Sequence, residues 1–231
     1  MTKIWQFSVD FNGFWYNKRM DIAGIVIIFI IIIFSMVLHE MAHAYVAYFL
    51  GDTTAKDEGR LSTNPLVHID PYMSVLVPVL LYVMGGPIFG GAKPVPIDSR
   101  NLKGGAWGMA LVAVAGPAMN FILALLAFLI GHFTGLVYET SYIGFFFREM
   151  IFANLGFMTF NLIPIPPLDG SRILYAIAPD GVRNFMEKIE GAIGLFLVLV
   201  LVVVFGSYLS EFMANIINGI LDFFLMIVGA A

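Results

Sequence analysis

Residues 22–50 read IAGIVIIFIIIIFSMVLHEMAHAYVAYFL, and Ile22–Leu38 within this stretch contains no charged residue. A second uncharged run covers Gly191–Ser210. Each run is long enough to approach or cross a hydrocarbon layer of about 30 Å. The whole chain of 231 residues is 60% hydrophobic and 12% charged, whereas soluble domains carry about 25% charged residues. The sequence therefore predicts an all-α polytopic membrane protein.

Apolar segments divide the chain and predict about five to six transmembrane helices. They are Ile22–Leu50, Val75–Phe89, Trp107–Phe133, Phe145–Ile163, Gly191–Leu209 and Phe212–Val228. Two stretches, Gly51–Pro71 and Gly90–Lys103, contain many turn-forming residues and are expected to be looped or extended. The first 21 residues lack the apolar core of a signal peptide and are expected to lie at the membrane interface. We expect residues 1–231 to form one membrane-embedded domain.

Composition also excludes some classes of function. The net charge is −4 and no basic run is present, so nucleic acid is not an expected partner. The chain has no cysteine, which excludes disulfides and thiolate metal sites.

The first apolar segment contains the motif His39-Glu40-Met41-Ala42-His43. On a helix, residues four apart share one face, so both imidazoles can reach one metal ion. The intervening Glu40 is placed to hold and deprotonate a water molecule. A glutamate is costly inside a bilayer unless it has a partner or a water-filled cavity, and a metal site supplies both. The motif therefore predicts catalytic zinc.

Catalytic zinc normally takes three protein ligands, so one more ligand is needed. His132, at the end of an apolar segment, is most simply an interface residue, and His68 lies in a structured loop. Asp169 is the strongest candidate, because it follows an apolar segment through Asn161-Leu-Ile-Pro-Ile-Pro-Pro-Leu-Asp-Gly. The prolines end the helix and Gly170 allows a tight turn, which can direct one carboxylate back into the protein.

These motifs together resemble the site-2 protease family (peptidase M50), in its compact branch without PDZ or CBS domains. The resemblance covers roughly residues 22–175, and the helices within 191–228 are accessory. It also includes Gly51-Asp52, Gly59-Arg60-Leu61, Asn64-Pro65, His68-Ile69-Asp70-Pro71, Lys93-Pro94-Val95-Pro96, and Ala115-Gly116-Pro117 with Asn120.

The resemblance implies an intramembrane zinc metalloprotease that acts on transmembrane proteins in the lipid bilayer. It implies that His39, His43 and Asp169 bind one Zn²⁺ and that Glu40 is the catalytic base. By the same resemblance, Asn161 would lie beside the catalytic water and the scissile carbonyl, where its amide can stabilise the oxyanion. An alternative interpretation makes Asn161 a hydrogen-bonding contact between helices, as for Asn154.

Topology depends on the segment Val75–Phe89. If all six segments span, His39 and Asp169 fall on opposite sides of the membrane and cannot share one ion. The segment is short, contains Pro78 and ends in Gly85-Gly86-Pro87, so we expect it to enter and return on one side. The active site is then expected nearer the cytoplasmic side of the cell membrane, with most of the basic residues on that side.

A substrate helix hides its peptide bonds, so part of the enzyme must hold the substrate extended. Lys93–Ile97 is a candidate, because Pro94 and Pro96 leave the N–H groups of Val95 and Ile97 on one edge, free to pair with protein or substrate. A proline-stiffened loop is the simpler interpretation. A membrane zinc transporter and an inactive membrane scaffold are the alternative functions. A transporter would not need Glu40 for chemistry. An inactive scaffold would be expected to lack a metal ligand or the glutamate, and all are present. A prenyl-peptide zinc protease would be expected to have glutamate in place of Asp169.

Overall fold

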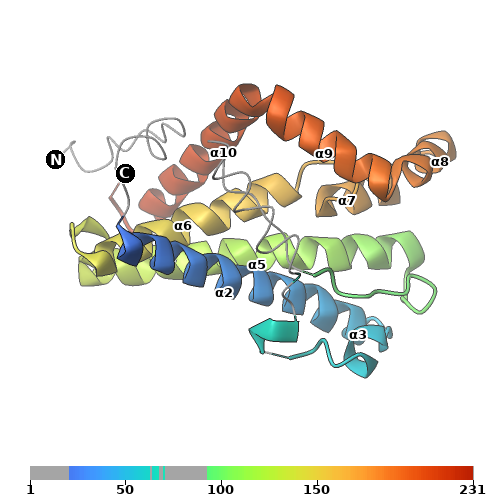
Figure 1. Cartoon of the computed structure of the whole chain (residues 1–231), viewed down its shortest axis with the longest axis horizontal. Helices are drawn as coiled ribbons and strands as arrows, with labels where there is room; N and C mark the ends of the chain where they lie inside the picture. Colours follow the sequence, from blue (N-terminus) through green and yellow to red (C-terminus); the bar gives the residue numbers. More distant parts are fainter. Residues whose placement is uncertain (1–20, 63, 68–69, 71–92, 231) are drawn as a thin grey trace.

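The computed structural model describes residues 21–62, 64–67, 70 and 93–230, and its regular elements are helices. The long helices are α2 (Ile22–Phe49), α5 (Gly105–Thr134), α6 (Tyr142–Asn161) and α10 (Gly206–Ile227) (Figure 1). The shorter elements are α3 (Thr54–Asp57), η1 (Pro65–Val67), η3 (Leu136–Tyr138), α7 (Asp169–Ile177), α8 (Asp180–Ile189) and α9 (Ala192–Val204).

The four long helices are each long and apolar enough to cross a membrane. Their outer surfaces support this assignment, because α2 exposes Val26, Ile30 and Phe34 in a row at four-residue spacing. A helix at the surface of a soluble protein would carry polar side chains on that face. An exposed apolar stripe fits lipid instead, and the predicted all-α polytopic membrane protein is confirmed.

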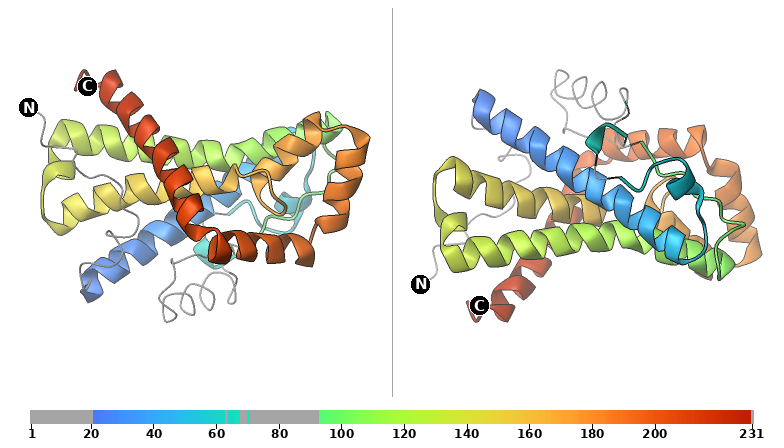
Figure 2. Two further views of the ribbon diagram at one scale, coloured as in Figure 1. Left: turned by 90° about the horizontal axis from the view of Figure 1, so that it is seen from above. Right: turned by 90° about the horizontal axis from the view of Figure 1, so that it is seen from below.

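Helices α2, α5 and α6 lie side by side and form the centre of the molecule (Figures 1 and 2). Where α2 ends, the N–H of Lys103 donates to the carbonyl of Leu50 at 2.8 Å, which brings the start of α5 to this point. At the opposite end, the hydroxyl of Tyr142 donates to the carboxylate of Asp21, so α2 and α6 begin together. Helices α2 and α6 therefore run in one direction and α5 runs in the other.

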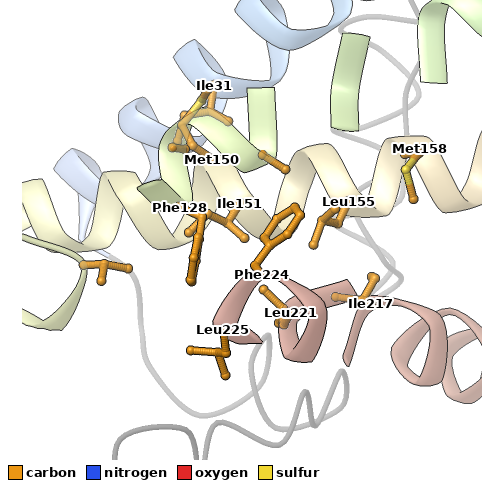
Figure 3. Close-up of a cluster of buried hydrophobic side chains, with 13 residues drawn as sticks. Ile31, Phe128, Met150, Ile151, Leu155, Met158, Ile217, Leu221, Phe224 and Leu225 are labelled. Atoms are coloured by element: carbon orange, nitrogen blue, oxygen red, sulfur yellow. The ribbon is translucent and has the colours of Figure 1, made fainter. Parts of the chain in front are cut away.

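The core lies where α10 crosses the central helices (Figures 2 and 3). Phe224 of α10 is fully buried, and its ring centroid lies 5.3 Å from that of Phe128 and 5.5 Å from that of Phe121, both on α5. Ile31 of α2 and Leu155 of α6 belong to the same buried cluster. In a bilayer such packing stabilises the bundle through van der Waals contact, because lipid tails are as apolar as the side chains.

The boundary predicted between the last two apolar segments is wrong. We expected one helix within Gly191–Leu209 and another within Phe212–Val228, but α9 ends at Val204 and α10 begins at Gly206. With 13 residues, α9 is about 20 Å long and falls short of a hydrocarbon layer of about 30 Å. Uniformly apolar sequence has no periodicity to mark a break, and Gly206 is the local signal that the sequence offers.

The predicted re-entrant segment Val75–Phe89 lies outside the described residues, but the elements on either side of it are described. The chain leaves α2 and enters α5 at the same end of the bundle, where the N–H of Asp98 also donates to Asp52 at 2.8 Å. A single crossing between these two points would have placed them at opposite ends. The same-end arrangement is the one that a re-entrant Val75–Phe89 requires. Among the described residues four helices are long enough to cross a membrane, and α9 is too short.

Candidate metal centre

Both histidines of the motif lie on the inner face of α2 and are buried. One helical turn separates His39 from His43, so their imidazoles project from the same face. The two Nε2 atoms are 3.0 Å apart, and the rings meet edge to face with centroids 4.6 Å apart. The helix periodicity predicted this pairing.

Asp169 completes the cluster from the first position of α7. Its Oδ2 lies 3.2 Å from Nε2 of His39, and its Oδ1 lies 3.4 Å from Nε2 of His43. The potential ligand atoms of the three residues all lie within 4.8 Å of one another. Among the described residues this is the group of three that can hold a metal ion, and its members are the three predicted ligands.

Gly170 lets the loop that follows α6 pack directly against the start of α7. A Cβ atom at position 170 would lie 2.1 Å from the carbonyl oxygen of Leu162 and 2.7 Å from that of Ile163, which is closer than real contacts allow. The predicted tight turn at Gly170 is wrong, because Gly170 is the second residue of α7 and has helical backbone. The chain turns in the loop before Asp169, and the glycine is needed for the close approach.

The hydrogen bonds around the cluster leave its inner atoms suited to bind a cation. Nδ1 of His39 lies 2.5 Å from Oδ1 of Asn120, and Nδ1 of His43 lies 2.7 Å from the carbonyl oxygen of Val112. Both partners accept hydrogen bonds, so both Nδ1 atoms carry the proton and the neutral rings present Nε2 lone pairs to Asp169. Atoms with lone pairs this close together need a shared proton or a cation between them.

The carboxylate of Asp169 also fits a metal ligand. Its Oδ2 is buried and has no satisfying hydrogen bond from the described residues. Two imidazole nitrogens and one carboxylate form a donor set typical of catalytic zinc, in which a fourth position stays open for water or substrate.

Gly116 lets α5 lie directly against the two histidines. A Cβ atom at this position would lie 2.4 Å from Nε2 of His43 and 2.5 Å from Nε2 of His39. Every other residue would place carbon among the ligand atoms. The sequence motif around Gly116 was recognised, but its role was not predicted, because it depends on a contact between two helices.

Glu40 lies next to this cluster and binds the extended segment that precedes α5. Its Oε2 accepts a hydrogen bond from the N–H of Val95 at 3.0 Å. The side chain of Val95 is buried against Ala44 and Ala55, which fixes the segment on α2. The described part of the predicted extended segment therefore lies beside the candidate metal centre, and the N–H of Val95 pairs with protein.

Arg60 holds the same segment from the other side. Its guanidinium donates to the carbonyls of Lys93 at 2.6 Å and Pro94 at 2.9 Å, and also to the carbonyl of Val67. The residue is 5% exposed, which is unusual for arginine. Arg60 thus joins the loop after α2 to the segment that contacts Glu40, a role that the sequence did not reveal.

The remaining predicted residues lie as follows. Asn161 is the last residue of α6, and its Nδ2 donates to the carbonyl of Phe157 at 3.0 Å. His132 lies near the far end of α5, about 24 Å along the helix from Gly116, and its Nδ1 is 2.6 Å from the hydroxyl of Tyr138. His132 is therefore not a ligand of this cluster. His68 lies outside the described residues.

Known proteins similar to this chain are named as zinc metalloproteases. It is 40% identical over 193 residues to the "Putative zinc metalloprotease YwhC" of Bacillus subtilis, an alignment that covers 80% of this chain and 84% of the relative. The chain belongs to the site-2 protease family. A second family member, the "Putative zinc metalloprotease Rip2" of Mycolicibacterium smegmatis, is 34% identical over 59% of this chain and 51% of its own length. No protein-family model and no solved structure matches the chain.

A more distant relative is the "Zinc metalloprotease MJ0392" of Methanocaldococcus jannaschii. It is 27% identical over 177 residues, which are 76% of this chain and 41% of that protein. Together with the apolar helices and the group of His39, His43 and Asp169 that can hold a metal ion, these relatives identify a membrane zinc metalloprotease.

Proposed function

We propose that this membrane metalloprotease hydrolyses peptide bonds in or near the transmembrane segments of other membrane proteins. The observation that carries the proposal is the position of the metal cluster inside a helix that can itself cross a membrane. His39 lies ten positions before Phe49, the last residue of α2. Ten residues of helix correspond to about 15 Å. A cluster within such a helix suits substrates that also lie in the bilayer.

The chemistry proposed is hydrolysis of an amide. Zinc, when bound by His39, His43 and Asp169, polarises the scissile carbonyl and makes water more acidic. Glu40 has one carboxylate oxygen held by the N–H of Val95, which fixes the orientation of the other oxygen. We assign to that carboxylate the removal of a proton from water and its transfer to the departing amine.

Asn161 is the proposed hydrogen-bond donor for the oxyanion. One N–H of its amide is used by the carbonyl of Phe157, and an amide nitrogen carries two N–H groups. The second is available for a developing negative charge. The position of Asn161 supports this role, since the loop that begins there carries the chain to Asp169.

The proposed catalytic unit is the part of the chain within about residues 22–175, and the helices within 191–228 are accessory. Helices α2 and α5 and the start of α7 supply the contacts of the metal cluster described above, and α6 packs against α2 and α5. Helix α10 supports them from outside through Phe224. Residues 1–231 are proposed to act as one membrane-embedded domain.

The metal cluster is proposed to lie nearer the cytoplasmic face of the cell membrane. The end of α2, the start of α5 and the start of α7 meet at one end of the bundle, and the basic residues of this part of the chain concentrate there. They are Lys56, Arg60, Lys93, Arg100, Lys103, Arg172, Arg183 and Lys188. An excess of Lys and Arg marks the cytoplasmic side of membrane proteins.

The test is cleavage of defined substrates by the purified protein in lipid nanodiscs. A panel of single-span proteins is incubated with the enzyme, beside soluble unfolded proteins of similar length. We expect cuts within or next to the transmembrane segment, loss of cleavage with a zinc chelator, and recovery on adding zinc. Cleavage of only the soluble proteins would contradict the proposal, while leaving the assignment as a zinc metalloprotease intact.

A further inference from the structure

Buried polar side chains from three helices form a continuous hydrogen-bonded chain that ends on a zinc ligand. Ser35 of α2, Asn120 of α5 and Asn154 of α6 are each 0% exposed. Oδ1 of Asn120 lies 2.5 Å from Nδ1 of His39, and Nδ2 of Asn120 donates to Oδ1 of Asn154 at 2.9 Å. Nδ2 of Asn154 donates to Oγ of Ser35 at 2.9 Å and to the carbonyl of Met150 at 2.8 Å.

The direction of this chain is fixed at its far end. The carbonyl of Met150 can only accept, so Asn154 must turn its NH₂ group toward it. The oxygen of Asn154 then faces Asn120 and accepts a hydrogen bond from the NH₂ group of Asn120. The oxygen of Asn120 is thereby turned to His39, and a carbonyl oxygen there requires a proton on Nδ1.

We propose that Asn154 and Asn120 are positioning residues that set the tautomer of His39 from the backbone of α6. With the proton on Nδ1, the lone pair on Nε2 points to His43 and Asp169, as zinc binding requires. With both amides reversed, the proton would move to Nε2 and block the site. His43 needs no such relay, because the carbonyl of Val112 accepts directly from its Nδ1.

Burial makes the relay effective. Water can donate or accept, so a solvated amide would turn freely, whereas these three side chains are fully buried. Partners beyond the ligands of a metal site fix the tautomer and the ring orientation, and their loss typically costs about tenfold to a hundredfold in metal affinity. The same size of effect is expected here from a residue that does not touch His39.

The test measures zinc affinity of the full chain in detergent by competition with a chromophoric chelator. Asn154→Leu keeps the branching and the number of side-chain heavy atoms but gives Asn120 nothing to donate to, so the amide of Asn120 can reverse. Zinc should bind about tenfold to a hundredfold more weakly. Asn120→Leu should weaken zinc at least as much. The double variant should be no weaker than Asn120→Leu alone, because Asn154 acts through Asn120.

One variant serves as a matched control. Thr159→Val removes a buried hydroxyl of α6 that donates only within its helix, to the carbonyl of Leu155 at 2.8 Å. Thr159 is outside the polar chain, so this variant should keep zinc affinity within about twofold of the parent.

Folding is checked by helical circular dichroism and by elution as a single species. If Asn154→Leu does not fold, Asn154→Ala replaces it, since a water in the space left would transmit no direction. A folded variant of Asn154 with the parent's zinc affinity would overturn the proposal. So would equal losses in Asn154→Leu and Thr159→Val, which would indicate a general packing effect. The readout is zinc binding, so the result is independent of the substrate proposed above.

Discussion

The N–H of Val95 donates to Oε2 of Glu40 at 3.0 Å, although the two residues are 55 positions apart in the chain. This bond ties the extended segment before α5 to the proposed catalytic base on α2. A carboxylate held by one oxygen keeps the other in a constant orientation, which favours proton transfer in a fixed geometry.

Glu40→Gln should abolish peptide cleavage and leave zinc bound. The amide oxygen of glutamine can still accept from Val95, so the local structure is preserved, but glutamine cannot accept a proton at neutral pH. Zinc content is measured by atomic absorption beside cleavage of a single-span substrate. Near-normal activity would exclude Glu40 as the base, and loss of zinc would assign it to the ligand set.

Arg60→Ala should reduce cleavage strongly with zinc retained. The buried guanidinium donates to the carbonyls of Val67, Lys93 and Pro94, and its loss should cost about 1.5–3 kcal/mol of stability and release the segment that orients Glu40. A misplacement of about 1 Å can cost about a hundredfold in rate. Thermal unfolding, zinc content and kcat are measured together.

The matched control for Arg60 is Arg100→Ala. Arg100 lies on the segment before α5 and is exposed. It forms an ion pair with Asp98 at 2.7 Å and has no hydrogen bond to Glu40, His39, His43 or Asp169 among the described residues. Exposed pairs of this kind contribute little to stability. If Arg100→Ala and Arg60→Ala reduce kcat equally, the positioning role of Arg60 is wrong.

Asp169→Ala should lose both zinc and activity, whereas His68→Ala should retain zinc. The first variant removes the one carboxylate of the cluster and leaves two imidazoles, too few for a catalytic zinc site. Metal analysis after dialysis against a weak chelator distinguishes the two variants. The reverse result would make His68 the third ligand.

Single cysteines test which elements share a side of the membrane, since the native chain has no cysteine to give background labelling. Glu58, Ser99 and Asn184 are exposed residues at the end of the bundle that carries the zinc cluster, and Thr140 is exposed at the opposite end. Cysteines at the first three positions should react alike with a membrane-impermeant thiol reagent. A cysteine at Thr140 should react only from the other side.

Labelling that separated position 58 from position 99 would contradict the arrangement of α2 and α5. The pattern in intact cells also tests the proposed orientation. Positions 58, 99 and 184 should be protected until the membrane is permeabilised, while position 140 reacts at once.

Much of the metal cluster could be predicted from the sequence because it depends on short-range sequence patterns. The four-residue spacing of His39 and His43 fixes their common face once a helix is assumed. Asp169 stands out because the prolines before it end the preceding helix and form the loop that leads to it. The fold class could also be predicted from the sequence, since long uncharged apolar runs are typical of membrane-spanning helices.

The contacts between distant segments could not be predicted. Nothing near Arg60 in the sequence shows that its partners are carbonyls more than 30 positions away. The polar chain from Asn154 to His39 likewise depends on how three helices pack. The break between α9 and α10 was misplaced for a different reason, because an unbroken run of Leu and Val gives no periodic signal at Val204.

The packing at Gly116 affects how substitution tolerance in this protein should be interpreted. Its contribution is the volume that it leaves empty, since the first carbon of any other side chain would lie 2.4–2.5 Å from the ligand nitrogens. In a saturation screen scored by activity, position 116 would therefore tolerate as few substitutions as His39 or Asp169. An investigator who ranked positions by tolerance alone would count four metal-binding residues, one of which has no side chain with which to bind.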